Sequence, residues 1–548
     1  MMEATTANTR KTFVSGVLLL SLSTVLVKLI GLIYKIPMLS YLGSEGMGYF
    51  NSAYEIYALF CVIATAGLPV ALSVLISGAI ARGERAQVGR IYRTARTLFL
   101  LIGFLGTAVM LIFARHFCRL IRSEDAYYCM LSIAPTVFFV CLSSALRGFF
   151  QGYQRMLPTA LSQIIESVGK LVFGLLLARF ALHRGYGSAT VAAFAGIGLT
   201  LGTAAATLYL LILKLRMPQK AAFDPQMENG ADREAASEVR RELVRLAFPV
   251  TVGASLVSLT KLIDMAMILR RLQSIGYTVV QANEAYGSYT TLALSVYGLL
   301  PSLINAVALP LVPMLSAAIA SGNRAKQAEM IHASYRITAI FAIPAALGVS
   351  AFSRPVLSLL FSKEPDAVSV AAPLLSCLGI SVFLSCMITA TNSVLHAYRA
   401  VNRPIFSMAV GALLKIAAAY IFIGSPAVAL LGAPISTFLC NLAVVTVNLC
   451  FSSRLCRVEG LQSVFWKPLS ASLLSVGTSY LLYLTAAVHY GMSAMLTLLS
   501  LLLAVLLYLL FSCLFGVISK EDVLALPMGE RIYSILKIMR LLPLTKDV

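Results

Sequence analysis

The sequence contains few charged residues, and it lacks the cysteine and histidine motifs from which many metal and enzyme sites are built. Only 12% of its 548 residues are Asp, Glu, Lys or Arg, while 59% are hydrophobic, which is far from the balance of a soluble globular protein. The ten cysteines include no CxxC pair, and the five histidines have no partner motif. We therefore expect neither a zinc site nor a disulfide framework, although Cys118 and Cys129 flank one predicted outer loop and either pair or remain unrelated thiols.

Motifs for nucleotide-driven or covalent chemistry are missing as well. The sequence contains no Walker loop, no nucleophile elbow and no GxGxxG before a helix, so we predict that the chain is not an enzyme, needs no cofactor and does not hydrolyse ATP itself. Its net charge is +20, yet no basic run is interleaved with aromatic residues in a soluble domain. Nucleic acid is therefore not the expected partner.

Long apolar runs are what the sequence has in abundance. Stretches of about 20 residues recur along its whole length, and they predict an all-α integral membrane protein with about fourteen transmembrane helices. They are too long for the strands of an outer-membrane barrel. The predicted spans are 13–39, 51–80, 95–113, 127–147, 158–180, 189–213, 246–269, 289–319, 337–353, 369–397, 404–424, 427–451, 468–488 and 491–517.

Two ten-residue segments indicate an internal repeat. SGAIARGERA at 77–86 and SAAIASGNRA at 316–325 are identical at seven places under a shift of 239 residues. Six predicted spans separate the copies, so two parallel six-helix lobes should be related by a pseudo-two-fold axis along the membrane normal. The predicted organisation is a first lobe at 1–213, a cytoplasmic linker at 214–245, a second lobe at 246–453, two extra helices at 454–518 and an amphipathic tail at 519–548.

The distribution of basic residues predicts the orientation. With an even number of spans both termini lie on one side, and the loops and span ends of that side hold 29 of the 43 Lys and Arg residues, against 10 on the other side, where Lys35 is counted. By the positive-inside rule, we expect a multi-pass protein of the cell (inner) membrane with both termini in the cytoplasm.

A short list of charged residues inside these spans supplies the candidate site. A charge at mid-membrane costs at least about 2.5 kcal/mol and normally faces a polar cavity or a partner. Lys28 in VKLI and Lys261 in TKLI occupy matching places in the two halves, and Lys415 matches Lys170 under a shift of 245. The full list is Lys28, Lys35, Glu55, Glu166, Lys170, Lys261, Asp264 and Lys415. Five lysines against three acids predict a central cavity that suits an anionic substrate.

Structural explanations compete with this one. A lysine near a span end can extend to the membrane surface, and this is the competing explanation for Lys35 and Lys415. Glu166 and Lys170 are four residues apart and can form a salt bridge within one helix. The remaining acids, Glu55 and Asp264, can simply neutralise neighbouring lysines.

Two segments carry a resemblance to a known family. KLIGLIYKIPMLSYLGSEGMGYFNSAYEIY at 28–57 and LRGFFQGYQRMLPTALSQIIESVGKLV at 146–172 resemble the stage V sporulation protein B and MurJ-like branch of the multidrug/oligosaccharidyl-lipid/polysaccharide (MOP) exporter superfamily. The resemblance runs over nearly the full length. It implies a fourteen-helix flippase that moves an undecaprenyl-pyrophosphate-linked glycan from the inner to the outer leaflet. It also implies basic cavity residues at Lys28, Lys35 and Lys261, and a groove for the lipid tail at 468–517. The family's cavity cations are often arginines, whereas lysine lacks the bidentate guanidinium fork.

The residues and the resemblance together give a functional hypothesis. Lys28, Lys261 and Lys35 would hold the pyrophosphate, and the sugar hydroxyls would contact Tyr54, Gln163 and Asn392. Transport would be driven by the membrane potential, worth about 2.3 kcal/mol per charge per 100 mV, or by a Na+ or H+ gradient through Glu55 or Asp264. A lipid II-type peptidoglycan precursor is the first candidate substrate. Spore cortex precursor, teichoic acid and capsule units present a similar pyrophosphate.

Three rival functions make different predictions. A MATE-type drug or cation antiporter should have an acid-dominated cavity. A multi-pass glycosyltransferase should carry a sizeable outer loop with acids, whereas the longest outer loops here, 114–126 and 270–288, are short. A non-transporting scaffold would leave the paired buried lysines unexplained. Cell-wall synthesis enzymes are candidate partners.

Overall fold

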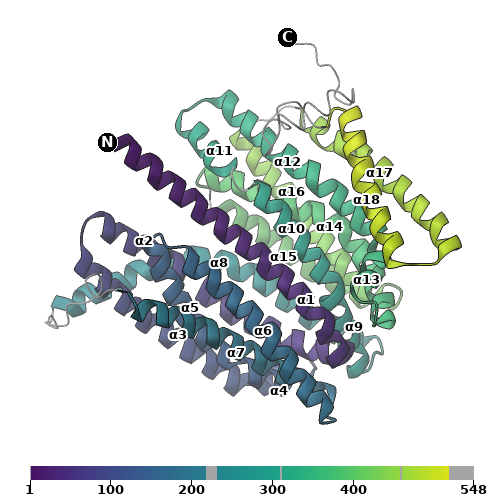
Figure 1. Cartoon of the computed structure of the whole chain (residues 1–548), viewed down its shortest axis with the longest axis horizontal. Helices are drawn as coiled ribbons and strands as arrows, with labels where there is room; N and C mark the ends of the chain where they lie inside the picture. Colours follow the sequence, from purple (N-terminus) through teal and green to yellow (C-terminus); the bar gives the residue numbers. More distant parts are fainter. Residues whose placement is uncertain (1, 218–230, 309–310, 401, 457–459, 518–548) are drawn as a thin grey trace. The chain divides into compact units, whose positions relative to one another are not determined.

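The chain folds as a set of long helices (Figure 1). The computed structural model describes residues 2–217, 231–308, 311–400, 402–456 and 460–517, and these contain no strand. The α-helices are α1 Met2–Thr65, α2 Leu68–Ala81, α3 Arg85–Leu120, α4 Tyr127–Ile133, α5 Pro135–Gly152, α6 Leu157–His183, α7 Ser188–Leu215, α8 Ala231–Ser274, α9 Val279–Ser288, α10 Leu294–Ala308, α11 Leu311–Ala320, α12 Arg324–Ala351, α13 Ser353–Leu360, α14 Pro365–Ala397, α15 Asn402–Ile423, α16 Gly432–Leu455, α17 Leu461–Tyr490 and α18 Ala494–Leu514. The predicted tail at 519–548 lies outside the described residues.

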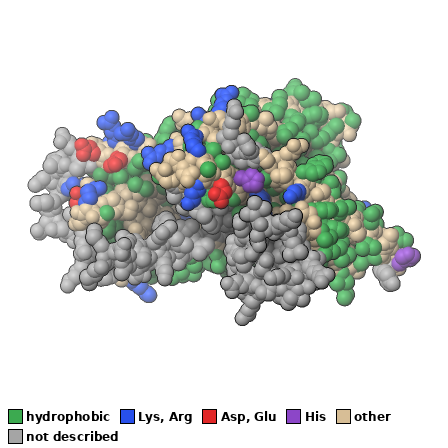
Figure 2. Space-filling view, turned by 90° about the horizontal axis from the view of Figure 1, so that it is seen from above, with side chains coloured by type: hydrophobic (Ala, Val, Ile, Leu, Met, Phe, Trp, Pro, Cys, Tyr) green, Lys and Arg blue, Asp and Glu red, His purple; other side chains and the backbone are tan. Residues whose placement is uncertain are grey.

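The surface of these helices is apolar, as a bilayer requires. Large side chains such as Phe104, Leu481 and Leu502 are more than half exposed, and Figure 2 shows apolar side chains in broad surface areas, with Lys and Arg in separate groups. Helices suit this surface because each satisfies its own backbone hydrogen bonds in lipid. The prediction of an all-α multi-pass membrane protein is confirmed.

The number of spans stays a prediction. Eleven described segments are long and apolar enough to cross a membrane, and the first of them, Leu22–Ala81, covers two predicted spans. Helix α6, which matches the predicted fifth span, is not among the eleven. Its apolar run is interrupted by Gln163, Glu166 and Lys170.

The helices form two compact units whose boundary differs from the predicted lobe boundary. Unit 1 ends at Thr291 and unit 2 begins at Leu292, so α8 and α9 belong to unit 1, where both pack against α1 and α8 also packs against α2. The predicted boundary lay in the linker at 214–245. A compact unit is defined by packing, whereas a repeat is defined by sequence, and so the two boundaries need not coincide. The six-plus-six division remains a prediction.

The backbone repeats along with the sequence. Gly83 and Gly322, which the shift of 239 pairs, both have a positive φ, 77° and 69°. Gln154 and Arg399, which the shift of 245 pairs, do the same with φ of 58° and 57°. Residues other than glycine seldom adopt this conformation. The two halves therefore share unusual helix-ending turns as well as sequence.

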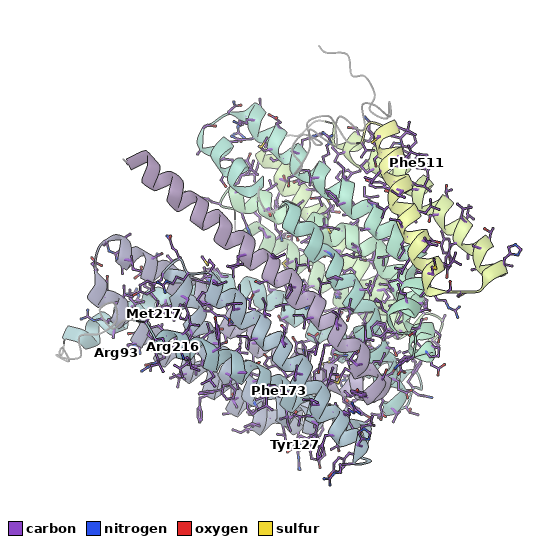
Figure 3. The ribbon with its side chains drawn as sticks, in the orientation of Figure 1. Arg93, Tyr127, Phe173, Arg216, Met217 and Phe511 are labelled. Atoms are coloured by element: carbon purple, nitrogen blue, oxygen red, sulfur yellow. The ribbon has the colours of Figure 1, made fainter. Side chains whose placement is uncertain are left out.

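Arg93 and Arg216, both in segments predicted to be cytoplasmic, lie at the same end of unit 1 (Figure 3). Figure 3 shows Arg93 of α3 and Arg216 at the end of α7 at one end of the unit, while Tyr127 lies at the other. Lys214 Nζ lies 3.3 Å from the ring centroid of Tyr92, which brings the ends of α7 and α3 together. The assignment of this end to the cytoplasm remains a prediction.

Away from these arginines, α1 and α9 approach backbone to backbone. A Cβ atom at Gly48 would meet the carbonyl oxygen of Asn283, and one at Gly287 would meet that of Ser44. A side-chain bond reinforces the approach, since Ser288 Oγ donates to Ser44 Oγ at 3.1 Å. Ser123, which follows α3, also holds α9, because its Oγ donates to Asn283 Oδ1 at 2.9 Å. Only glycine permits this contact at residues 48 and 287.

We expect Gly48→Ala to destabilise the protein by about 1–3 kcal/mol, because the added methyl group forces two packed backbones apart. Thermal unfolding in detergent would measure this as a lower midpoint. The control is Gly31→Ala on the same helix, where a Cβ atom meets nothing within 4 Å and alanine should be neutral or stabilising. Equal midpoints for the two variants would contradict the close approach.

Candidate functional site

Unit 1 brings together the lysines that the sequence singled out on α1 and α8. Lys28 and Lys35 lie two turns apart on α1, and their ammonium groups are both within electrostatic range of Lys261 on α8. Lys28 and Lys261 are exposed, whereas Lys35 is half-buried. Three cations from helices far apart in sequence thus share one region.

Lys35 is held by the protein instead of extending to a membrane surface. Its Nζ donates to the carbonyl oxygen of Thr290 at 3.2 Å. The amide of Asn51 donates to the hydroxyls of Thr290 and Thr291 at 2.8 and 2.9 Å. These bonds tie α1 to the π-turn Tyr289–Ala293 that follows α9, so Lys35 lies where α1 meets that turn.

The two acids of this region lie among the lysines. Glu55 is within electrostatic range of Lys35, Lys261 and Asp264. It is half-buried on α1, and Asp264 lies one turn beyond Lys261 on α8. Both acids are therefore placed to neutralise part of the lysine charge, as one of the structural explanations proposed.

Glu166 pairs with a different residue from the one suggested by its spacing. Its Oε2 accepts from Arg147 Nη2 of α5 at 2.8 Å, and Arg147 Nε also donates to Ser162 Oγ at 2.9 Å. Thr203 of α7 donates to the other carboxylate oxygen at 3.4 Å. The salt bridge between Glu166 and Lys170 within α6 is therefore not formed, because the guanidinium fork of Arg147 reaches the carboxylate across the helix contact.

Lys170 instead lies among aromatic rings. Its Nζ is 4.7, 5.1 and 5.8 Å from the ring centroids of Tyr54, Tyr34 and Phe50. Ring faces attract an ammonium group by their quadrupole, and more strongly where water is excluded. Lys170 is also within electrostatic range of Lys35, so the region contains four lysines.

The other predicted contacts are spread over both units. In unit 1, Gln163 Oε1 accepts from Ser23 Oγ at 3.4 Å. In unit 2, Asn392 Oδ1 accepts from Asn448 Nδ2 at 2.8 Å, so this oxygen is already used between helices. Lys415 is buried on α15 and within electrostatic range of Tyr297, which does not fit a lysine that extends to the membrane surface.

Sequence reasoning missed Arg147 and two of the three ring partners of Lys170, Tyr34 and Phe50. The predicted fourth span ended at residue 147, which placed this arginine at a membrane surface, whereas α5 continues to Gly152. A signal was available, because the shift of 245 pairs Arg147 with Asn392, a residue already selected. No such signal marked Tyr34 and Phe50, since aromatic residues in apolar spans are common.

The extra helices of unit 2 form a groove. A space of about 400 Å³ lies between α17 and α18, lined by Leu482, Thr485, Ala486, His489, Leu496, Leu499, Ser500 and Leu503. The lining is largely aliphatic, so it suits a hydrocarbon chain. Among the described residues no cluster of three His, Cys, Asp or Glu side chains could hold a metal ion, and no two described cysteines, Cys118 and Cys129 included, form a disulfide bond.

Two family models match the chain. The model of the polysaccharide biosynthesis protein family matches residues 13–319, more than half of the sequence, and the MatE model matches residues 249–421. Stage V sporulation protein B of Bacillus subtilis (strain 168) is 24% identical over 440 residues, which cover 78% of this chain and 81% of that protein. The lipid II flippase MurJ of the same strain is 23% identical over 415 residues, covering 73% and 75%.

The fold matches solved transporters. A structure of the lipid II flippase MurJ in an inward closed conformation superposes with a TM-score of 0.67 at 17% identity, covering 91% of this chain and 98% of that one. The predicted resemblance is confirmed, and the relative MurJ is named a flippase, which is a transporter and not an enzyme, as expected.

Cysteines introduced at the exposed lysines should report whether water reaches them. In a variant without native cysteines, we expect Lys28→Cys and Lys261→Cys to react with a charged, membrane-impermeant maleimide in inside-out vesicles, because both side chains are exposed and would face an aqueous space. Phe104→Cys is the matched control, since it is exposed but should face lipid. Equal protection of all three thiols would contradict a water-accessible site.

Proposed function

We propose that this chain, which belongs to the polysaccharide biosynthesis protein family, is a flippase for an anionic lipid-linked glycan. The substrate would be an undecaprenyl-pyrophosphate-linked sugar, with a lipid II-type peptidoglycan precursor as the first candidate. Alternating access would carry its head group from the cytoplasmic to the outer leaflet while the polyprenyl chain stays in lipid.

The lysine cluster of unit 1 is the observation that carries this proposal. It contains four lysines. Lys261 is within electrostatic range of both Lys28 and Lys35, and Lys35 is also within electrostatic range of Lys170. Glu55 and Asp264 lie among them, and Glu166, which is within electrostatic range of Lys170, is already paired with Arg147. Cations thus outnumber available carboxylates by four to two, and such a region attracts a pyrophosphate.

A cation antiporter fits this site less well. The MatE match at residues 249–421 makes it the second candidate, but an antiporter of drugs or cations needs unpaired acids. Glu166 is instead held in an ion pair of 2.8 Å. The balance of charge in unit 1 therefore favours an anionic substrate.

The remaining parts of the hypothesis follow from the same site. The groove between α17 and α18 would hold the lipid tail, and Tyr54 and Gln163 would contact sugar hydroxyls. Glu55 or Asp264 would carry Na+ or H+ if an ion gradient drives transport. A membrane potential would act on the net charge of the loaded site.

We expect Lys28→Ala together with Lys261→Ala to abolish flipping without unfolding the protein, because two exposed phosphate-binding cations are lost. The measurement is rescue of growth in a bacterium depleted of its own lipid II flippase. Lys363→Ala with Lys467→Ala removes equal charge from unit 2, outside the unit that holds the cluster, and should rescue normally. Full rescue by the first variant would show that the cluster does not bind the substrate.

The identity of the glycan can be read from what accumulates. We expect depletion of this protein in its own cell to increase one undecaprenyl-pyrophosphate-linked intermediate on the cytoplasmic face, identifiable by mass spectrometry of the lipid extract. A muropeptide-bearing lipid supports the peptidoglycan precursor. Accumulation of a teichoic acid or capsule unit alone would replace it with that substrate.

A further inference from the structure

The polar residues that join α5, α6 and α7 in unit 1 have counterparts in unit 2. Arg147, Ser162 and Thr203 correspond to Asn392, Ser407 and Asn448 under the shift of 245. In unit 2, Ser407 Oγ donates to Asn448 Oδ1 at 2.6 Å, and Asn448 Nδ2 donates to Asn392 Oδ1 at 2.8 Å. Both copies therefore place polar residues at the same three positions of corresponding helices, and in unit 1 Glu166 completes the network by accepting from Arg147 and Thr203.

The copies differ in charge. Unit 2 uses only neutral groups, and Gly411 stands where unit 1 has Glu166. Unit 1 places an ion pair there, with 13% and 23% of the Arg147 and Glu166 side chains exposed. Because neutral groups are sufficient to join the helices in unit 2, the joining of helices does not by itself explain the ion pair.

The position of Lys170 suggests a reason why unit 1 has an ion pair where unit 2 has neutral groups. It lies one turn beyond Glu166 on α6, within reach of a rotated carboxylate, and Glu166 is within its electrostatic range. Among the described residues, the ammonium group of Lys170 contacts three aromatic rings and no carboxylate. Glu166 thus has two candidate cations, Arg147 across the helix contact and Lys170 on its own helix.

We infer that Glu166 is an internal counter-ion that exchanges between Arg147 and Lys170 and so controls binding and release of the anionic substrate. While Glu166 pairs with Arg147, the ammonium of Lys170 is open to a phosphate oxygen. When the carboxylate turns to Lys170, it replaces that oxygen and the substrate leaves. This inference rests on the proposed function and adds Arg147 as a positioning residue.

In either state Glu166 neutralises one of the two cations, and the other keeps a contact that does not depend on Glu166, aromatic rings for Lys170 or Ser162 for Arg147, which makes the exchange feasible in a membrane. No covalent bond or proton transfer is required, only rotation of the Glu166 side chain. In the released state Arg147 keeps its bond to Ser162, and its guanidinium remains partly exposed. Charged groups in a membrane protein require such partners or water in each state.

Removing Arg147 tests the exchange directly. In Arg147→Asn, which installs the residue of the second copy, Glu166 is released to Lys170, and the affinity for undecaprenyl pyrophosphate in detergent micelles should fall by about tenfold. In Arg147→Asn/Glu166→Gln no carboxylate competes, so affinity should return to within about twofold of the original. Arg93→Asn is the control, because it changes an exposed arginine of α3, and this variant should bind undecaprenyl pyrophosphate normally.

Glu166→Gln alone should separate binding from turnover. Its affinity should equal or exceed that of the unaltered protein because Lys170 stays open. Its rate of flipping a fluorescent undecaprenyl-pyrophosphate glycan in proteoliposomes should fall, because release loses its competing carboxylate. A residue that only joined helices would not produce this split.

The outcomes distinguish the two proposals. If the unaltered protein binds undecaprenyl pyrophosphate no better than Lys28→Ala/Lys261→Ala, the proposed function fails. If it binds, but Arg147→Asn/Glu166→Gln stays as weak as Arg147→Asn, or Glu166→Gln flips at the normal rate, the exchange is overturned. If Arg147→Asn does not fold, a triple variant takes its place. Arg147→Asn/Glu166→Gly/Thr203→Asn copies the neutral network of unit 2 and should bind undecaprenyl pyrophosphate normally. Weak binding by this variant in its folded form would also overturn the exchange.

Discussion

A charge inside an apolar helix needs a partner or water, and this requirement organises unit 1. Lys35 reaches a backbone carbonyl, Lys170 lies among aromatic rings, and Arg147 forms an ion pair with Glu166. Each of these three contacts joins different segments of the chain, so all three can form together only if the helices pack in one particular way. The buried charges therefore constrain the packing of the helices as well as the substrate.

The internal repeat shows which features are architectural. Positions that join three helices are polar in both copies, and unusual turns recur at Gly83 and Gly322. Charge, in contrast, is unequal, because the ion pair of the first copy has a neutral equivalent in the second. Duplicated scaffolds can keep their mechanical contacts in both halves while one half acquires the groups that act on a ligand.

Much of the fold was predictable, but the partners of individual charges were not. Apolar runs of membrane-spanning length marked the helices because lipid exposure imposes composition directly. The spacing of Glu166 and Lys170 favoured a bond within α6, yet Arg147 took the carboxylate from a neighbouring helix. Spacing along the sequence indicates which residues of the same helix can form an ion pair, but not which residues of other helices compete for it. A contact between helices depends on their rotation and height, and short sequence patterns do not encode these.

The sequence by itself determined that this is a helical membrane transporter with a doubled plan and lysines at matching depths, since each follows from composition or repetition along the chain. Only the tertiary structure decided that Lys28, Lys35 and Lys261 share one region, that α8 packs within unit 1, and that Glu166 is held away from Lys170. The reason is physical. Burial of apolar surface depends on residue type, whereas electrostatic interaction depends on distances that exist only once the helices have packed.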